Sequence, residues 1–341
     1  MNMKRCLAAG LAMGACLMGE ARNDETSETF LHKTMANAFP TFRKLGAVCE
    51  CGEASPFVFK GKLMRMELFD PTCATVADDP RICIRIRDVA SGKILSSFGK
   101  DCYYPTALAD GDKVYVTATR RTYWLRGEKT DTFHSGETIV LFESSDLVNW
   151  TSREIITRPG WHIFNTTMTK GPDGYVLAYE SNHPSCVPFT MFFATSKDLK
   201  TWTLMGDSRA YPAKRYCGGP FLRYHNGWYY LSLCAELPCE RYCTYLFRTR
   251  DFRHWDTGRY NPFLFVTQDD RRVSPNAQDI SEALLNKIPT AFVCSLADVE
   301  MCDFEGKTYI NYGIGDQHGF YYWAEAWYDG SVGELLERFF K

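Results

Sequence analysis

The chain has 341 residues, of which 45% are hydrophobic and 15% aromatic, so it can bury a large core. Its 39 Lys and Arg residues nearly balance 41 Asp and Glu residues, giving a formal net charge of −2 without a long run of one sign. This balance excludes the basic surface typical of nucleic-acid-binding proteins. We therefore expect no nucleic-acid partner.

The start of the chain has the features of an export signal over residues 1–21. Lys4 and Arg5 precede a short apolar run, and small residues follow it. The tetrapeptide MGAC within this run also resembles a bacterial lipobox, which leaves a lipid anchor open. We predict an exported protein, periplasmic or extracellular, with an N-terminal extension over residues 22–44. No later segment is long and apolar enough to predict an integral membrane span.

Fourteen cysteines occur, and Cys6 and Cys16 fall within the predicted signal. The remaining even number permits disulfides in an exported chain. Cys234 and Cys294 nevertheless lie in apolar strand patterns, where cysteine packs as a small hydrophobic residue. The pairs CEC and CERYC lack a second pair at zinc spacing, so no metal site is predicted from them.

A β-hairpin pattern recurs along the chain. Each copy has an apolar strand, a short turn containing Gly, and an aromatic-rich strand. The copies are residues 55–69, 104–119, 165–181, 219–236 and 299–313. Gly and Asn in these turns accept the positive φ that a tight hairpin needs. Each copy therefore predicts two antiparallel strands.

A second motif follows three of these hairpins: an apolar strand, then a tight turn that ends in Trp. It reads ESSDLVNW, ATSKDLKTW and RTRDFRHW, and its tryptophans are Trp150, Trp202 and Trp255. Four antiparallel strands in a repeat of about fifty residues, in five copies, are typical of a β-propeller. We predict an all-β fold, a five-bladed β-propeller of four-stranded antiparallel blades over residues 45–331. A short helix at 332–341 is expected to pack on it.

The spacing of Asp and Trp, which recurs in the three copies of this turn, has a structural interpretation. The aspartates, Asp146, Asp198 and Asp251, can accept hydrogen bonds from backbone N–H groups of the turn. The tryptophan rings can pack between adjacent blades. We therefore expect no catalytic role for these residues.

The pattern carried by SSDLVNW, TSKDLKTW and TRDFRHW resembles the five-bladed propeller glycosidases of the clan that contains glycoside hydrolase families 43 and 32. The resemblance covers roughly residues 45–331 and implies an exo-acting glycosidase for plant, algal or host glycans. Family 43 typically places Asp, Asp and Glu at the starts of innermost strands in blades one, three and four. Ser55, Asn165 and Gly218 stand at these positions here, so the family's acid and base cannot be carried over.

Other carboxylates are expected at the same end of the blades. The second strand of a hairpin runs back to the mouth at which the first begins, which points to Glu67, Glu180, Glu236 and Asp316. Asp298 and Glu300 are two residues apart and so share one side of a strand entering the pocket. Paired carboxylates are what glycoside hydrolysis needs. We predict catalytic roles for Glu67, Glu180 and Asp298, with Glu300 in reserve. The alternative for any one of these acids is a structural role, as a solvated strand-end carboxylate or one paired with an Arg such as Arg65.

An inverting mechanism is the more natural hypothesis, with Glu180 as general acid and Asp298 as base. Residues suited to sugar binding flank the same mouth, since amides and imidazoles bind hydroxyls and aromatic rings cover sugar C–H groups. They are Trp161, His162, Asn165, Asn182, His183, Arg215, Tyr216, Asp316, Gln317 and His318. Trp161 and His162 have an alternative place in the core between blades. No cofactor is required, although Asp298 and His318 leave an axial Ca²⁺ open.

Two other functions remain open at this stage. The replacements at Ser55, Asn165 and Gly218 fit a non-catalytic, glycan-binding propeller. A glycoside phosphorylase would need basic residues around phosphate, for which Arg65, Lys214, Arg215 and His318 are available. A sialidase is disfavoured because the repeated turn lacks the Gly of the Asp-box pattern. The sequence does not determine the sugar, the linkage or the oligomeric state.

Overall fold

The computed structural model describes residues 39–50, 52–71, 81–126, 132–182, 189–212, 214–238, 241–316 and 318–341. The predicted signal, most of the N-terminal extension, His183 and Gln317 lie outside these residues. The chain divides into two compact units, Met1–Pro40 and Thr41–Lys341, and the second contains every element described below. In the described ranges, no helix has the length and apolarity needed to cross a membrane.

Three separate four-stranded antiparallel sheets follow one another along the chain. The first contains β2 (Glu53–Phe59), β3 (Lys62–Phe69), β4 (Cys83–Asp88) and β5 (Ile94–Phe98). The second contains β6 (Cys102–Asp110), β7 (Lys113–Arg120), β10 (Thr138–Ser144) and β11 (Thr151–Thr157), with the hairpin β8 (Tyr123–Arg126) and β9 (Thr132–Ser135) between β7 and β10. The third contains β12 (His162–Gly171), β13 (Gly174–Asn182), β14 (Thr190–Ser196) and β15 (Thr203–Leu204).

A fourth, eight-stranded sheet joins two further four-stranded groups. One group is β16 (Cys217–His225), β17 (Trp228–Leu237), β18 (Arg241–Thr249) and β19 (Trp255–Thr257). The other is β20 (Ser295–Phe304), β21 (Lys307–Gly315), β22 (Tyr321–Asp329) and β1 (Arg43–Cys49). A single parallel pair, Tyr242 with Ser295, links the groups. Because β1 pairs with β22, a strand from the start of this unit completes the group made by its last strands.

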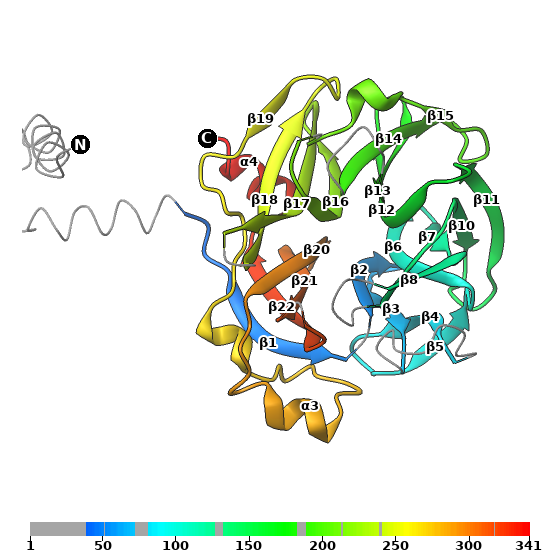
Figure 1. Cartoon of the computed structure of the whole chain (residues 1–341). Helices are drawn as coiled ribbons and strands as arrows, with labels where there is room; N and C mark the ends of the chain where they lie inside the picture. Colours follow the sequence, from blue (N-terminus) through cyan, green and yellow to red (C-terminus); the bar gives the residue numbers. More distant parts are fainter. Residues whose placement is uncertain are drawn as a thin grey trace, which may run out of the picture. The chain divides into compact units, whose positions relative to one another are not determined.

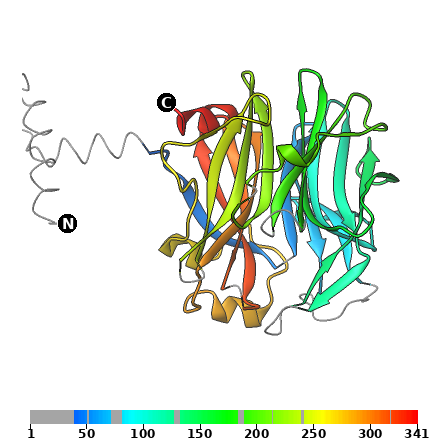
Figure 2. The ribbon, with the colours of Figure 1, turned by 45° about the horizontal axis from the view of Figure 1, so that its top comes forward.

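The first strands of the groups surround a common centre (Figures 1 and 2). Along the chain β2 contacts β6, β6 contacts β12, β12 contacts β16 and β16 contacts β20, and β20 in turn contacts β2. Apolar side chains between neighbouring sheets form the core, as where Phe57 and Met66 of the first sheet pack with Val116 and Phe142 of the second. The predicted all-β class is confirmed, and the count of five blades stays a prediction.

The repeated turn is structural, as the sequence indicated. Asp146 Oδ1 accepts hydrogen bonds from the N–H groups of Val148 and Asn149, at 2.9 and 2.8 Å. Asp198 and Asp251 make the equivalent bonds in their own turns. The Trp150 ring, which follows the first turn, stacks on Phe98 of the preceding sheet with centroids 4.2 Å apart. These residues hold the turns and fill the space between sheets.

Short helices occur outside the sheets: η1 (Asp207–Arg209), η2 (Gln268–Arg271), α3 (Glu282–Lys287) and α4 (Val332–Arg338). α4 is the helix expected near the C-terminus. Ser331 caps it by accepting from Glu334 N, and Leu335 and Leu336 are fully buried. A capped helix with one buried apolar side is typical of an element that packs on a larger core.

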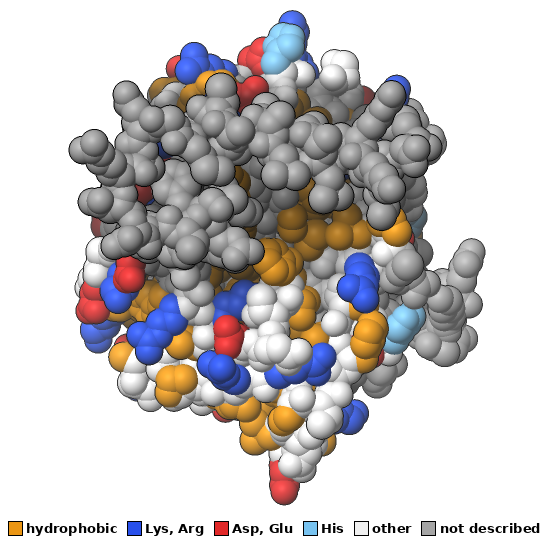
Figure 3. All heavy atoms as spheres, turned by 90° about the vertical axis from the view of Figure 1, so that its left-hand side faces the viewer, with side chains coloured by type: hydrophobic (Ala, Val, Ile, Leu, Met, Phe, Trp, Pro, Cys, Tyr) orange, Lys and Arg blue, Asp and Glu red, His pale blue; other side chains and the backbone are white. Residues whose placement is uncertain are grey.

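Two further features bear on the sequence analysis. Six cysteines in the described part of the chain are buried free thiols: Cys83, Cys102, Cys217, Cys234, Cys243 and Cys302. On the face shown in Figure 3, the Lys and Arg side chains that are described lie among hydrophobic and uncharged ones and form no continuous basic patch.

Candidate active site

The first strands carry a β-bulge at the same level in four of the groups. The pairing register shifts between Tyr103 and Thr106 in β6, and at the corresponding place in β12, β16 and β20. Gly219 in β16 and Asp298 in β20 occupy their bulges with positive φ values of 55° and 52°. A bulge changes which way a side chain points. Here the bulges turn residues of several sheets toward the common centre.

A small cavity of about 10 Å³ lies at this level. Its lining comes from β2, β6, β12, β16 and β20 and consists of Glu53, Ala54, Pro105, Thr106, Asn165, Thr166, Gly219, Pro220, Asp298 and Glu300. Glu180 of β13 reaches the same place, because it accepts hydrogen bonds from Asn165 and Gly219. Four carboxyl groups from three different parts of the chain therefore converge: Glu53, Glu180, Asp298 and Glu300.

Glu180 is held with its carboxyl almost fully out of solvent, at 4% exposure. Its Oε2 accepts from Asn165 Nδ2 at 2.9 Å and from Gly219 N at 3.1 Å. Burial raises the pKa of Glu180 to about 8, with a further rise from the neighbouring Asp298 and a partial reduction by the two hydrogen bonds. Glu180 is therefore mainly protonated at neutral pH.

Asp298 is the carboxyl of this cluster that ionises most readily. Burial raises its pKa to about 6. Burial also raises the pKa of Glu300 well above its ordinary value, although Arg223 and the Ser55 hydroxyl, 3.3 Å from Glu300 Oε2, act in the opposite direction. The pKa of Glu53 is raised well above its ordinary value by burial and then by the other carboxylates. Closely spaced buried carboxyls cannot all be charged, so they share protons.

Two carboxyl groups of the cluster, Glu180 and Glu300, lie beside Ser55, Asn165 and Gly218, the positions at which family 43 typically has its acids. A Cβ added to Gly218 would lie 3.4 Å from Glu180 Oε2, so Glu180 occupies the space into which a side chain at 218 would project. Asn165 donates to the same carboxyl. Ser55, the third replacement, donates to Glu300.

Gly219 is required by the same arrangement. A Cβ there would fall 1.9 Å from Asp298 Oδ1. The Gly218–Gly219 pair therefore lets two carboxyls, Glu180 and Asp298, approach one stretch of backbone closely.

The structure does not bring Glu67 to this cavity. Glu67 is fully buried among three guanidinium groups, accepting from Arg65 Nε at 2.9 Å, Arg87 Nε at 2.7 Å and Arg85 Nη2 at 2.9 Å. Burial acts to raise the pKa of Glu67, but Arg65, Arg87 and Arg85 outweigh it and lower the pKa below its ordinary value. The arginines share its face of the sheet because β3 and β4 pair Glu67 with Arg85 directly. Glu67 is therefore a carboxylate paired with Arg65, the alternative to a catalytic role that the sequence left open.

Trp161 and His162 also lie apart from the cavity lining. The Arg158 guanidinium stacks 3.4 Å from the Trp161 ring centroid, and Phe192 packs edge-on against the same ring. His162 Nδ1 is hydrogen-bonded to Ser135 Oγ at 2.9 Å. Both side chains thus contact neighbouring strands, as in the alternative that placed them in the core.

Among the other residues expected to bind sugar, Asn165 and Tyr216 are close to the carboxyl cluster. The Tyr216 hydroxyl would lie 3.5 Å from a Cβ at Gly218, next to Glu180. Asn182 pairs with His162 at the end of the β12–β13 hairpin, two residues beyond Glu180.

The remaining described residues of the expected set, Arg215, Asp316 and His318, lie in loops. Arg215 lies over the ring of Phe247 on β18, with a separation of 5.3 Å. Asp316 Oδ1 accepts from the backbone N–H groups of His318 and Phe320, so this carboxylate stabilises the turn before β22.

Sequence reasoning missed Glu53. It begins β2, the first strand of the first sheet, two residues before Ser55 and therefore on the same side of the strand. A rule that first strands begin at the pocket, applied to every acid near their starts, would have found it.

Among the described residues, no group of three or more His, Cys, Asp or Glu side chains is arranged to hold a metal ion. His318, one of the two residues considered for an axial Ca²⁺, is exposed in the turn held by Asp316. These side chains do not fit a metal site, and no metal enters the chemistry proposed below.

Comparison with known proteins identifies the class of fold. No protein-family model and no curated protein matches the chain. Solved structures do: the predicted likeness to propeller glycosidases of families 43 and 32 is confirmed at the level of the fold.

Three solved structures illustrate the match. A protein described as a glycoside hydrolase has a TM-score of 0.54 and 13% identity, over 89% of this chain and 96% of the other. A thermostable family-43 glycoside hydrolase has a TM-score of 0.51 and 12% identity, over 84% of this chain and 91% of the other. A variant of the Bombyx mori GH32 beta-fructofuranosidase in complex with sucrose has a TM-score of 0.52 and 13% identity, over 89% of this chain and 66% of the other.

Proposed function

We propose that this protein is a glycosidase whose catalytic carboxyls have moved to new positions in the fold. The observation that carries the proposal is the Glu180 carboxyl, which fills the space beside Gly218 and has its pKa raised to about 8 next to Asp298, whose pKa is about 6. Two carboxyls with separated pKa values are the requirement for acid and base roles at one pH.

In the proposed reaction, protonated Glu180 gives its proton to the glycosidic oxygen as the bond from that oxygen to the anomeric carbon breaks. Ionised Asp298 takes a proton from the water whose oxygen bonds to the anomeric carbon. The leaving alcohol and the released sugar then depart, and exchange with solvent restores both carboxyls. This sequence inverts the anomeric configuration.

Glu53 and Glu300 are proposed to bind sugar hydroxyls. Burial raises the pKa of both carboxyls well above the ordinary value, which favours the protonated form, and in that form each can donate or accept a hydrogen bond. The positive charge of Arg223 acts on Glu300 in the opposite direction.

The cavity has a volume of about 10 Å³, enough for about one water molecule, such as the one that Asp298 is proposed to activate. Exo action stays part of the proposal because of the resemblance to propeller glycosidases. The finer features of the proposal are a propeller of five blades, one for each four-stranded group, and export of the protein to act on glycans outside the cytoplasm.

The test is hydrolysis of a panel of aryl glycosides and natural oligosaccharides by the intact protein, Glu180→Gln and Asp298→Asn. Each substitution is expected to lower kcat by about 10²–10⁴-fold, the range for loss of a general acid or base. Glu236→Gln is the matched control. Glu236 lies near the end of β17 as Glu180 lies near the end of β13, but the Glu236 side chain is exposed. The anomer first released, followed by NMR, tests inversion.

Wild-type activity in either carboxyl variant would refute the assignments. The second candidate is a non-catalytic glycan-binding protein, which the replacements at Ser55, Asn165 and Gly218 favour. Glycan binding by the intact protein without cleavage of any substrate would support it.

A further inference from the structure

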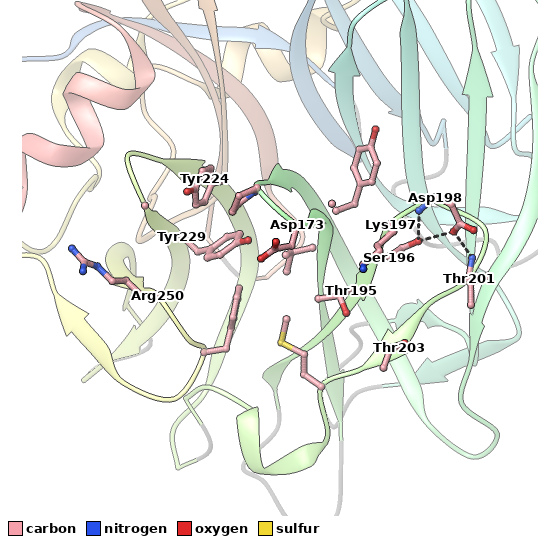
Figure 4. A pocket seen from close by; sticks show the side chains of 17 residues that line it. Asp173, Thr195, Ser196, Lys197, Asp198, Thr201, Thr203, Tyr224, Tyr229 and Arg250 are labelled. Carbon is pink, nitrogen blue, oxygen red and sulfur yellow. Dashed lines mark hydrogen bonds between the residues drawn. The ribbon is translucent and has the colours of Figure 1, made fainter.

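A larger groove lies at the opposite end of the strands from the carboxyl cluster (Figure 4). It has a volume of about 670 Å³ and is formed by the β12–β13 and β16–β17 hairpins and by the turns that follow β14 and β18. Tyr175, which lines the groove, and Glu180 are five positions apart on β13. At the rise of an antiparallel strand their Cα atoms are about 17 Å apart. We call this the hairpin groove.

Aromatic rings form one wall of the hairpin groove. Tyr224 and Tyr229 lie with ring centroids 4.9 Å apart, and Tyr229 and Phe252 lie 4.8 Å apart. Tyr229 and Phe252 are 9% and 5% exposed, so the core fixes them, while Tyr224 is more exposed. The wall is therefore rigid before any ligand arrives.

Polar side chains face this wall. In the view of Figure 4, Asp173 lies between Tyr229 and the side chains of Thr195 and Lys197. Within the part of the chain that the structure describes, the Asp173 carboxylate and the Lys197 ammonium group make no hydrogen bond or ion pair. These groups remain able to bind a ligand.

The charges of the lining balance. Asp173 and Asp198 carry negative charge, and Lys197 and Arg250 carry positive charge. The Asp198 carboxylate is already used by its turn, with Oδ1 accepting from Lys200 N and Thr201 N. A strongly charged ligand would find no matching excess here, whereas a neutral ligand rich in hydroxyls would find donors, acceptors and aromatic surface together.

We propose that the hairpin groove is a second saccharide-binding site, separate from the carboxyl cluster, that takes a neutral oligosaccharide chain. The volume accommodates several sugar rings, in contrast to the central cavity. Tyr224 covers a ring face, and Asp173, Lys197 and Thr203 bind hydroxyls. The site holds a polymer on one face of the protein and does not depend on catalysis at the other.

Affinity electrophoresis tests this proposal on the full chain carrying Glu180→Gln, so that no substrate is cleaved. Gels contain soluble neutral polysaccharides (xylan, arabinan, galactan or fructan) or polygalacturonate as the acidic comparison. A polymer offers many internal segments and few ends, so retardation reports the groove more than an end-binding cavity. We expect at least one neutral polymer to retard the protein.

Two variants locate the binding. Tyr224→Ala is expected to raise the Kd for a hexasaccharide of the retarding polymer by about five- to tenfold, which corresponds to the free energy of one aromatic contact. Thr203→Trp places a bulky ring at an exposed edge strand of the groove and is expected to abolish retardation. Lys200→Trp is the matched control, because Lys200 is exposed in the adjacent turn and does not line the groove.

Retardation that persists in Thr203→Trp would overturn the proposal, as would retardation by polygalacturonate alone or by no polymer at all. The outcome is independent of the proposed glycosidase activity. Retardation that depends on the hairpin groove, together with no hydrolysis of any substrate by the intact protein, would support this site and refute the proposed catalysis. Hydrolysis by the intact protein, together with no retardation, would do the reverse.

Discussion

Replacing Asn165 with alanine is expected to extend activity to higher pH. Asn165 Nδ2 donates to Glu180 Oε2 at 2.9 Å, a bond that favours the ionised carboxylate and so lowers its pKa. Removing the donor raises the pKa of Glu180. A general acid must be protonated, so activity is lost as pH rises through this pKa, and the loss occurs later in the variant.

The size of the change follows from the site. A hydrogen bond to a charged group contributes about 1.5–3 kcal/mol, and about 1.4 kcal/mol corresponds to one pKa unit. Gly219 N, 3.1 Å from the same oxygen, keeps its bond, so the lower end of the range applies. We expect the pKa of Glu180 to rise by about one unit from its value of about 8.

The assay is kcat/KM against pH, with a substrate identified in the hydrolysis panel. For the intact protein we expect a bell-shaped profile with an optimum near pH 7, between the pKa of Asp298 at about 6 and that of Glu180 at about 8. In Asn165→Ala the alkaline limb moves up and the acidic limb stays. Asn182→Ala, on the same hairpin but beyond Glu180, is the control and should leave both limbs in place. An alkaline limb that stays or moves down in Asn165→Ala would refute the assignment of Glu180 as the acid.

Three further predictions concern the same region and its surroundings. Gly219→Ala should abolish most activity while the fold persists, because its Cβ would lie 1.9 Å from Asp298 Oδ1; near-normal kcat in a folded variant would contradict this. Glu67→Gln should lower the free energy of unfolding by about 3–5 kcal/mol in urea denaturation, since it leaves buried arginines uncompensated, whereas the partly exposed Glu143→Gln should change it by under about 1 kcal/mol. Because Glu180 keeps its proton in the fold but has an ordinary pKa of 4.5 when unfolded, its contribution to stability should fall by about 3.5 kcal/mol between pH 5 and 8, and Glu180→Gln should flatten this slope; a stability that rises over that range would count against the raised pKa.

The all-β class and the structural turns could be predicted from the sequence because they depend on local patterns. The hydrogen bonds of the Asp146 carboxylate connect it to residues within three positions, so the local sequence is enough to predict the geometry of the turn. Hairpins likewise need only alternating strands and a Gly-containing turn. The expectation that Glu180, Asp298 and Glu300 converge rested on strand direction, and the structure brings all three together.

The failures arose where strand direction alone is insufficient. Glu67 and Glu180 both lie near the ends of second strands, yet their side chains point to different surroundings. Both strands follow a two-residue turn, closed by Phe59 with Lys62 and by Gly171 with Gly174. Glu67 is five positions after Lys62 and Glu180 is six positions after Gly174, so the alternation of side chains places the two carboxyls on opposite faces of their sheets. Strand direction predicts the end of the sheet that a residue reaches, and only the count from the turn predicts its face.

The sequence by itself determined the repeat, the turns and the carboxyl residues available to the centre. Only the tertiary structure decided which of the available carboxyls meet and what pKa each has there, and that arginines neutralise Glu67. The physical reason is that a carboxyl's pKa depends on its burial and on charges within a few ångströms. Around Glu180 those neighbours come from β12, its hairpin partner, and from β16 and β20, which are distant in the chain and which the packing of the sheets brings close.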